Sequence, residues 1–321
     1  MQKSTMRIFF SAAVALVVSG AISGKAQAGE IWVTNMTSGN VQVFDSDSRQ
    51  IIATIETGKG AHNVAISRDG KRALISNVGA HTVTIIDAAA KTVIANVAAG
   101  KKTHDVSISP DGTRALASSV GDSAITLIDI AKGKALYTKT LGKKAMMSVF
   151  ANDKKHAFVV DAVGLKIFKV DYSTGSVKKS FPGGKGGMAF IPSMDWKSAW
   201  ITAPGDNKIL KLDLASAKIT GKISVSDSPH GLVLSSDGSR AFVVQRALDS
   251  IAIVDTALGK VVKSEWLGTK PDMLAISPDG KTLYVTIRGE DKLMLLSSSD
   301  LSKIAVIKTD KQPHGVAYRG G

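Results

Sequence analysis

The sequence predicts an all-β fold, a seven-bladed β-propeller with four strands in each blade. The first observation is a 42-residue period that runs through the chain without an insertion, which is typical of propeller repeats. Two aspartate series keep this step. One comprises Asp45, Asp87, Asp129, Asp171, Asp213 and Asp255, with Ser297 in the seventh place, and the other comprises Asp69, Asp111, Asp153, Asp195, Asp237 and Asp279.

The second observation is that one period divides into four short strands. Residues 62–67 and 72–77 form apolar segments separated by the turn 68–71, where Asp69 and Gly70 have typical turn chemistry. Residues 82–87 alternate between apolar and polar side chains, as a third strand should, and 92–97 supply a fourth. Four strands of five or six residues joined by tight turns indicate one blade.

The third observation concerns the two ends of the repeat array. The array starts at a second strand, 31–35, and stops after a first strand, 314–318. We therefore expect the C-terminal inner strand to pair with three N-terminal strands, so that the ring closes without an exposed edge. The aspartates of both series are expected to cap turns rather than to do chemistry.

The first 28 residues have the pattern of a signal peptide. Lys3 and Arg7 precede an apolar run over 8–22, and Ala26-Gln27-Ala28 resembles a cleavage site. We expect removal of 1–28, a single propeller domain over 29–321, and a soluble monomer in the periplasm or secreted, without a membrane span. The chain has no cysteine, which excludes disulfides, thiolate metal ligands and thiol catalysis.

The chain is basic, with 41 Lys and Arg against 27 Asp and Glu, a formal charge of +14. Loss of the three basic residues in 1–28, which contain no acidic residue, leaves +11. This excess permits an anionic small molecule, an acidic protein or nucleic acid as partner. Nucleic acid is the less favoured partner, because aromatic residues that stack on bases are few and do not recur in register.

The repeat resembles that of the YVTN family of seven-bladed, exported propellers. The motif stands as ISPDGTRALASS (108–119), SSDGSRAFVVQ (235–245) and ISPDGKTLYVT (276–286), and TVTIIDAAAKTVIANV (82–97) shows the strands that follow it. The segments 152–154 and 194–196 lack the turn glycine, so their blades are expected to be less regular. The resemblance implies several functions among relatives: DNA binding in the periplasm, lactonase activity, and propeller domains of nitrite reductases and quinoproteins.

A third series with the same period is not uniform. We call it the mouth ring, because it precedes the innermost strand of each blade, at one mouth of the central channel: His62, His104, Met146, Met188, His230, Asp272 and His314. Imidazole and carboxylate are metal ligands, which predicts a site for Cu, Zn or Fe at His62, His104, His230, His314 and Asp272. Met146 and Met188 would add soft ligands or packing to a bound cofactor. The alternative is that the ring only fills the channel mouth.

Lysines recur three residues before the mouth ring. This lysine rim comprises Lys59, Lys101, Lys143, Lys185 and Lys311. A positive rim opposes a free cation and favours an anion. We therefore predict a non-catalytic binding protein that holds an anionic ligand, cofactor or metal complex at the mouth. The alternatives are a lactonase-like or redox enzyme using the same ring, and a docking scaffold for protein or nucleic acid. No nucleophile elbow, P-loop or HExxH motif occurs in the sequence.

Overall fold

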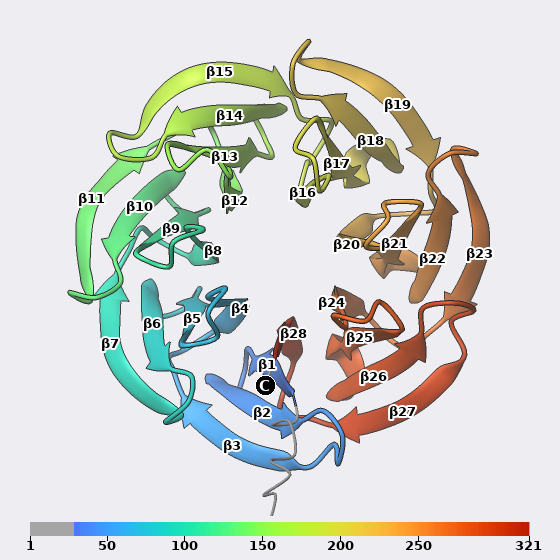
Figure 1. Cartoon of the computed structure of the whole chain (residues 1–321), viewed down its shortest axis with the longest axis horizontal. Coiled ribbons are helices and arrows are strands. Elements are labelled where there is room, and N and C mark those ends of the chain that lie inside the picture. Colours follow the sequence, from blue (N-terminus) through green and yellow to red (C-terminus); the bar gives the residue numbers. More distant parts are fainter. Residues whose placement is uncertain (1–28, 321) are drawn as a thin grey trace, which may run out of the picture.

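Seven four-stranded antiparallel sheets lie around a central channel in the computed structural model, which describes residues 29–320 (Figure 1). The predicted seven-bladed propeller is therefore confirmed. The predicted signal peptide, 1–28, lies outside the described residues. Among residues 29–320, no helix has the length and hydrophobicity of a membrane span.

The strand order from the channel outward is the same in every blade. The closing blade comprises β28 (Pro313–Arg319), β1 (Glu30–Asn35), β2 (Asn40–Asp45) and β3 (Ile51–Glu56). The next two comprise β4 (Ala61–Ile66), β5 (Arg72–Asn77), β6 (Thr82–Asp87) and β7 (Thr92–Ala98), then β8 (Thr103–Ile108), β9 (Arg114–Ser119), β10 (Ala124–Asp129) and β11 (Lys134–Thr140).

The remaining four blades follow the same order. Two comprise β12 (Ala145–Phe150), β13 (His156–Asp161), β14 (Lys166–Asp171) and β15 (Ser176–Pro182), then β16 (Phe190–Pro192), β17 (Ser198–Ala203), β18 (Lys208–Asp213) and β19 (Lys218–Ser224). The last two comprise β20 (Pro229–Leu234), β21 (Arg240–Gln245), β22 (Ser250–Asp255) and β23 (Lys260–Trp266), then β24 (Pro271–Ile276), β25 (Thr282–Ile287), β26 (Lys292–Ser297) and β27 (Lys303–Lys308). Three short 3-10 turns follow second strands: η1 (Pro204–Asp206), η2 (Arg246–Leu248) and η3 (Arg288–Glu290).

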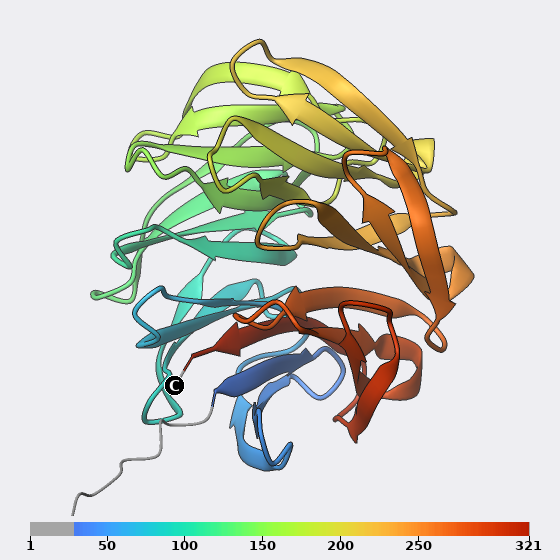
Figure 2. The same cartoon turned by 45° about the vertical axis from the view of Figure 1, so that its right-hand side comes forward.

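The two ends of the chain close the ring as predicted. In both views the dark red β28 lies beside the blue β1 (Figures 1 and 2), and their antiparallel register pairs Glu30 with Arg319 and Val33 with Val316. The Arg319 guanidinium contacts the buried Glu30 carboxylate at 3.0 Å. Tyr318 stacks on Tyr284 of the preceding blade, with ring centroids 5.9 Å apart. Backbone pairing, an ion pair and aromatic packing thus hold the closure together.

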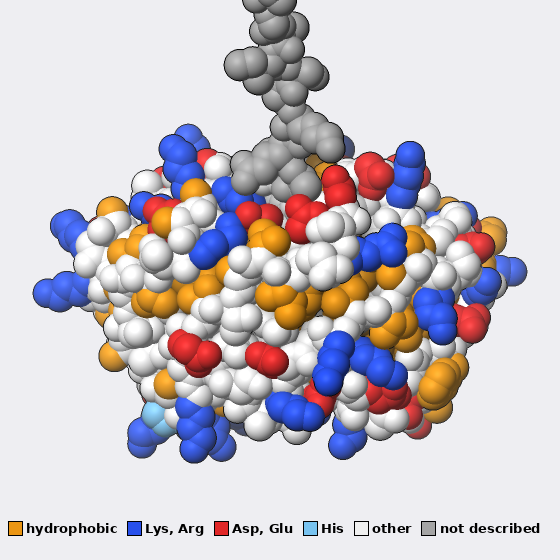
Figure 3. Space-filling model, turned by 90° about the horizontal axis from the view of Figure 1, so that it is seen from below, with side chains coloured by type: hydrophobic (Ala, Val, Ile, Leu, Met, Phe, Trp, Pro, Cys, Tyr) orange, Lys and Arg blue, Asp and Glu red, His pale blue; other side chains and the backbone are white. Residues whose placement is uncertain are grey.

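The hydrophobic core lies between neighbouring blades rather than within one of them. Successive side chains of a middle strand face opposite junctions, and the apolar ones pack there across two blades, as Trp32, Val43 and Ile75 do between the closing blade and the next. The outermost strands bury only one face. Their exposed apolar residues form a belt on the outer wall, interspersed with lysines (Figure 3), and include Ile51, Ile52, Val93, Ile94, Leu136, Val177, Val262, Trp266, Ile304 and Val306.

The two aspartate series cap turns, as expected. The Asp87 carboxylate accepts hydrogen bonds from the amides of Ala89 and Ala90 at 3.1 and 3.0 Å. Asp69 accepts one from the Ser67 hydroxyl at 2.7 Å and one from the Lys71 amide at 3.0 Å. Equivalent contacts recur around the ring, so these carboxylates serve the turns on the face opposite the mouth.

The two blades without the turn glycine behave differently from each other. Gly70 and Gly112 occupy the turn position with φ of 68° and 72°, whereas Lys154 and Trp196 take the same left-handed conformation at 54° and 55°. A side chain in this region costs roughly 1–2 kcal/mol. The inner strand β16 has only three residues, which confirms the irregularity of its blade, but β12 keeps six.

Candidate functional site

A β-bulge sits at the start of most inner strands, at the mouth-ring residue. In β4, Ala61 pairs with Asn77 and Val64 with Ile75, so His62 and Asn63 both lie opposite Ser76. The same shift occurs in β8, β12, β20, β24 and β28. A bulge re-aims the side chain that it inserts, and it leaves part of the backbone ladder unpaired. The mouth ring is therefore built by a recurrent irregularity of the inner strand.

A hydroxyl on the second strand satisfies the bulge and joins it to the next blade. Ser76 Oγ accepts from the Asn63 amide at 3.0 Å and donates to the carbonyl of His104 at 3.0 Å. Thr34, Thr202 and Thr286 do the same in their blades. Each of these hydroxyls fixes the backbone of a mouth-ring residue in the neighbouring blade.

Three imidazoles are oriented by one repeated hydrogen bond. Nδ1 of His104, His230 and His314 lies 2.9, 3.1 and 3.1 Å from the carbonyl of the next mouth-ring residue. Because a carbonyl only accepts, Nδ1 carries the proton and Nε2 carries a lone pair. The fourth, His62, packs in a tilted arrangement against His314 and His104 with ring centroids 3.6 and 4.2 Å away, and its Nδ1 has no hydrogen-bond partner within residues 29–320.

Burial keeps these histidines neutral. Burial, together with neighbouring positive groups, lowers the pKa of His104 to about 4 and holds the pKa values of His62, His230 and His314 well below the ordinary 6.5. Arg246 contributes to the lowering for all four. At neutral pH the mouth thus presents uncharged imidazoles, and His104 can accept a hydrogen bond or bind a metal through Nε2.

Asp272 is held by two arginines. The Asp272 side chain is fully buried, and its carboxylate forms ion pairs with Arg246 and, at 3.2 Å, with Arg288. Arg246 also donates to Nε2 of His230 at 2.8 Å. The arginine side chains are 27% and 25% exposed. Because guanidinium stays charged, the three groups carry a net charge of +1 beside neutral histidines.

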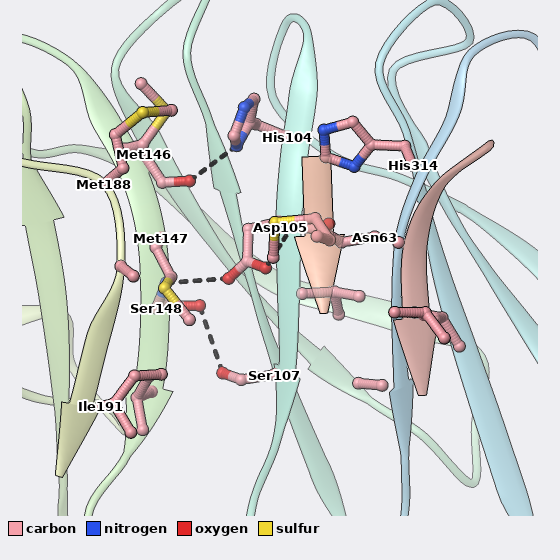
Figure 4. Close-up of a pocket in the computed structure, with 18 of the residues that line it drawn as sticks. Asn63, His104, Asp105, Ser107, Met146, Met147, Ser148, Met188, Ile191 and His314 are labelled. Carbon is pink, nitrogen blue, oxygen red and sulfur yellow. Dashed lines mark hydrogen bonds between the residues drawn. The ribbon is translucent and has the colours of Figure 1, made fainter. Parts of the chain in front are cut away.

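The structure brings only part of the predicted site to one cavity. A cavity of about 320 Å³ in the channel is lined by His104, His230 and His314 and by Met146 and Met188 (Figure 4). His62 and Asp272 are buried and do not line it. Within residues 29–320, no three His, Asp or Glu side chains are arranged to hold a metal ion. The predicted ligand set of four histidines and Asp272 therefore stays a prediction, with two members behind the cavity wall.

The lysine rim is exposed and does not line the cavity either. Lys59, Lys101, Lys143, Lys185 and Lys311 are all exposed. Carboxylates of neighbouring loops accept hydrogen bonds from rim backbone amides, as Asp122 does from Lys101 and Asp206 from Lys185, both at 2.9 Å. Lys311 forms an ion pair with Asp291 at 2.9 Å. These acids offset part of the positive field of the rim. Arg246 and Arg288 do not line the cavity either, but Arg246 contacts His230, which does.

Below the mouth, the cavity has a polar wall on one side. The Asp105 carboxylate accepts from the Ser148 amide at 3.0 Å and from the Asn63 side-chain amide at 2.9 Å, and burial raises its pKa to about 6 (Figure 4). Ser107 and Ser148 share a hydroxyl hydrogen bond at 3.2 Å. The opposite wall includes Leu232 and Met273.

Sequence reasoning missed the two arginines, although their register gave a signal. They belong to a fourth series with the 42-residue step, directly after each second strand: Met36, Val78, Val120, Ala162, Pro204, Arg246 and Arg288. Five members are apolar and two adjacent blades carry arginine. Asp272, the acidic member of the mouth ring, lies on β24 of the blade that carries Arg288 and pairs with both arginines. Comparing this series with the mouth ring would have found the cluster.

Two family models match parts of the chain. The cytochrome D1 heme domain matches residues 29–182, and the YNCE-like β-propeller matches residues 139–240. Together with the seven blades, the second match bears out the resemblance of the repeat. The chain is a seven-bladed propeller whose repeat resembles the YVTN type. No curated protein matches this sequence.

Solved structures similar to this propeller bear names that describe different functions. The periplasmic gluconolactonase of Pseudomonas aeruginosa superposes with a TM-score of 0.76 at 16% identity, covering 91% of this chain and 99% of the other. Hydrazine synthase of Kuenenia stuttgartiensis gives 0.74 at 16%, covering 92% and 99%. Dihydro-heme d1 dehydrogenase NirN, in complex with DHE, gives 0.68 at 15%, covering 90% and 74%. At such identities the likeness concerns the fold alone.

Proposed function

We propose that this propeller is an exported protein that binds an anionic, carboxylate-bearing ligand or metal complex at the channel mouth. The observation that carries the proposal is the arginine pair: Arg246 and Arg288 outweigh Asp272 by one positive charge and remain about one-quarter exposed. Guanidinium groups recognise carboxylates through paired hydrogen bonds. The lysine rim would attract the ligand to the mouth.

The imidazoles supply the second half of the proposed site. His104 and His314 line the cavity with Nδ1 bound to a carbonyl. Nε2 of His104 is left to accept a hydrogen bond or to coordinate a metal, whereas Nε2 of His314 lies 3.6 Å from the Asp272 carboxylate. In metalloproteins, a hydrogen bond of this kind from the ring nitrogen that does not bind the metal orients the imidazole. Met146 and Met188 would pack against the ligand from the other side of the cavity. This arrangement suits a ligand that combines a metal with acidic groups.

Carboxylated iron tetrapyrroles are one ligand class of this kind. The match to the cytochrome D1 heme domain and the likeness to NirN support this class. The donor set fits, because imidazole binds heme iron and arginine or lysine pairs with acidic substituents. A cavity of about 320 Å³ is at the small end of ligand sites, so part of such a ligand would lie over the lysine rim. When bound, the group would supply a redox-active iron.

Titration with iron protoporphyrin IX tests the proposal. Its absorbance should change in a saturable way on binding to the full chain. The variant Arg246→Ala/Arg288→Ala should weaken binding at least tenfold, about 1.4 kcal/mol. Arg240→Ala, which removes an exposed arginine contacting Ser298 and Ser299, is the matched control and should bind as the wild type does. Equal binding by all three proteins would contradict the proposed site.

Lactone turnover is a second candidate function, favoured by one observation. An imidazole, a buried carboxylate and two guanidiniums meet at the mouth, where Arg246 contacts both His230 and Asp272. The likeness to a periplasmic gluconolactonase supports testing it. Hydrolysis of gluconolactone above the spontaneous rate, lost in His230→Asn, would establish this function instead. The same likeness supports an exported, periplasmic location.

A further inference from the structure

The arc of the mouth opposite Asp272 has a different chemistry. Met146 and Met188 occupy adjacent places in the mouth ring, and His104 stands next to Met146. All three line the same cavity, and Met188 packs against the core cluster that contains Met146. We propose that His104, Met146 and Met188 form a binding site for a monovalent soft metal ion, Cu(I). This site lies on the arc opposite the arginine pair and shares His104, Met146 and Met188 with the cavity of the proposed anionic ligand, but the copper proposal does not rest on that ligand.

His104 is oriented for coordination on this arc. Its Nδ1 donates to the carbonyl of Met146 at 2.9 Å, which ties the imidazole to the residue that carries one of the thioethers. Nε2 makes no hydrogen bond within residues 29–320 and keeps its lone pair. Figure 4 shows the imidazole and both methionine side chains at the same level of the channel wall. One backbone hydrogen bond thus fixes the orientation of the imidazole relative to the backbone that carries Met146.

The ligand types select the ion. Thioether sulfur is a soft ligand that favours Cu(I), and imidazole also binds copper, whereas Mg²⁺ and Ca²⁺ prefer oxygen. All three ligands are neutral, so the bound ion keeps its full charge in an apolar wall where Met146 is 6% exposed. Transfer of a charge into such surroundings costs more for a divalent ion than for a monovalent one.

The positive charges of the mouth reinforce this selection. The lysine rim side chains are exposed and screened by salt within about 8 Å, so they disfavour a monovalent ion only weakly. A divalent ion would meet twice the repulsion. The other arc offers no equivalent site, because Nε2 of His230 accepts from Arg246 and Asp272 is paired with two arginines. The methionine arc is therefore the part of the ring suited to a cation.

Competition for Cu(I) tests the proposal. The full chain is titrated anaerobically against the chromophoric Cu(I) complex of bicinchoninate, and the wild type should remove one equivalent of copper. Met146→Leu/Met188→Leu keeps the volume and the apolar character but removes both sulfurs, and should weaken retention at least about tenfold. Met147→Leu/Met273→Leu is the matched control, because both methionines line the same cavity outside the proposed ligand set.

Three outcomes would overturn the site: no copper retention by the wild type, equal loss in both leucine variants, or unchanged retention in Met146→Leu/Met188→Leu. Melting curves check that both variants fold. His104→Gln should weaken retention without abolishing it, since two sulfurs remain. X-ray absorption of the copper-loaded wild type should show sulfur and nitrogen neighbours, and only nitrogen neighbours would contradict the proposal. Arg246→Ala/Arg288→Ala should retain copper normally, which separates this test from that of the anion site.

Discussion

The cluster of Asp272, Arg246 and Arg288 gives a stability prediction that can be worked from the structure. Asp272→Asn keeps the size of the side chain but removes the only negative charge between two arginines, at a position with no solvent exposure. Removing one partner of a buried ion pair costs about 3–5 kcal/mol. Because the arginines are about one-quarter exposed, water screens part of the repulsion, and we expect the lower value of about 3 kcal/mol.

Thermal unfolding followed by circular dichroism measures this effect. For a domain of this size, each kcal/mol lowers the melting temperature by about 2–4 °C, so Asp272→Asn should melt at least about 6 °C below the wild type. Asp237→Asn, an exposed turn carboxylate on the opposite face, is the control. The variant Arg246→Met/Asp272→Leu/Arg288→Met removes all three charges and should recover most of the stability. Equal melting temperatures for Asp272→Asn and Asp237→Asn would refute the reasoning.

Three further predictions concern turns, pH and closure. Lys154→Gly should raise the free energy of unfolding by roughly 0.5–1 kcal/mol because Lys154 has φ of 54°. Gly112→Ala should lower it by a similar amount, because Gly112 has φ of 72° and an added Cβ would meet no atom within 4 Å beyond its chain neighbours, so the cost comes from the backbone alone. No difference in denaturant unfolding would contradict this. Below pH 6.5 the four mouth histidines become protonated in the unfolded chain but stay neutral in the folded protein, in the case of His104 down to about pH 4. Asp105 acts in the opposite direction, because its pKa is raised to about 6 and its carboxyl group binds a proton in the folded state. Unfolding near pH 5 thus takes up about three protons, so stability should fall by about 4 kcal/mol per pH unit on acidification. Replacing the four histidines with Asn should abolish this fall in melting curves and leave the opposite contribution of Asp105, about 1 kcal/mol per pH unit. Deletion of 313–321 removes β28 and should abolish the cooperative transition, which an unchanged melting curve would disprove.

The repeat made the fold predictable to the level of single strands. The alternation of side chains along a strand and the turn about every ten residues are local properties that can be read from the sequence. The period of 42 therefore specifies a blade, and the two chain ends specify the closure. The pairing of β28 with β1 follows from that reasoning. What the period does not contain is the bulge at the start of the inner strand, because it depends on hydrogen bonds between blades, such as that from Ser76 to His104.

The candidate site was predictable only in part, for the same reason. The register placed His104, His230, His314, Met146 and Met188 near one another, and the structure brings them to one cavity. Whether a mouth-ring side chain faces the channel is decided by the neighbouring blades. Asp272 turns away toward two arginines whose series looks apolar in five of its seven places, and His62 is covered by the rings of His104 and His314.

The most direct measurement is the ligand content of the full chain purified under native conditions, by native mass spectrometry, elemental analysis and absorption spectroscopy together. An anion-binding mouth predicts an acidic small molecule or metal complex bound to the wild type and missing from Arg246→Ala/Arg288→Ala. A wild type that carries no ligand and also fails to bind iron protoporphyrin IX would contradict it.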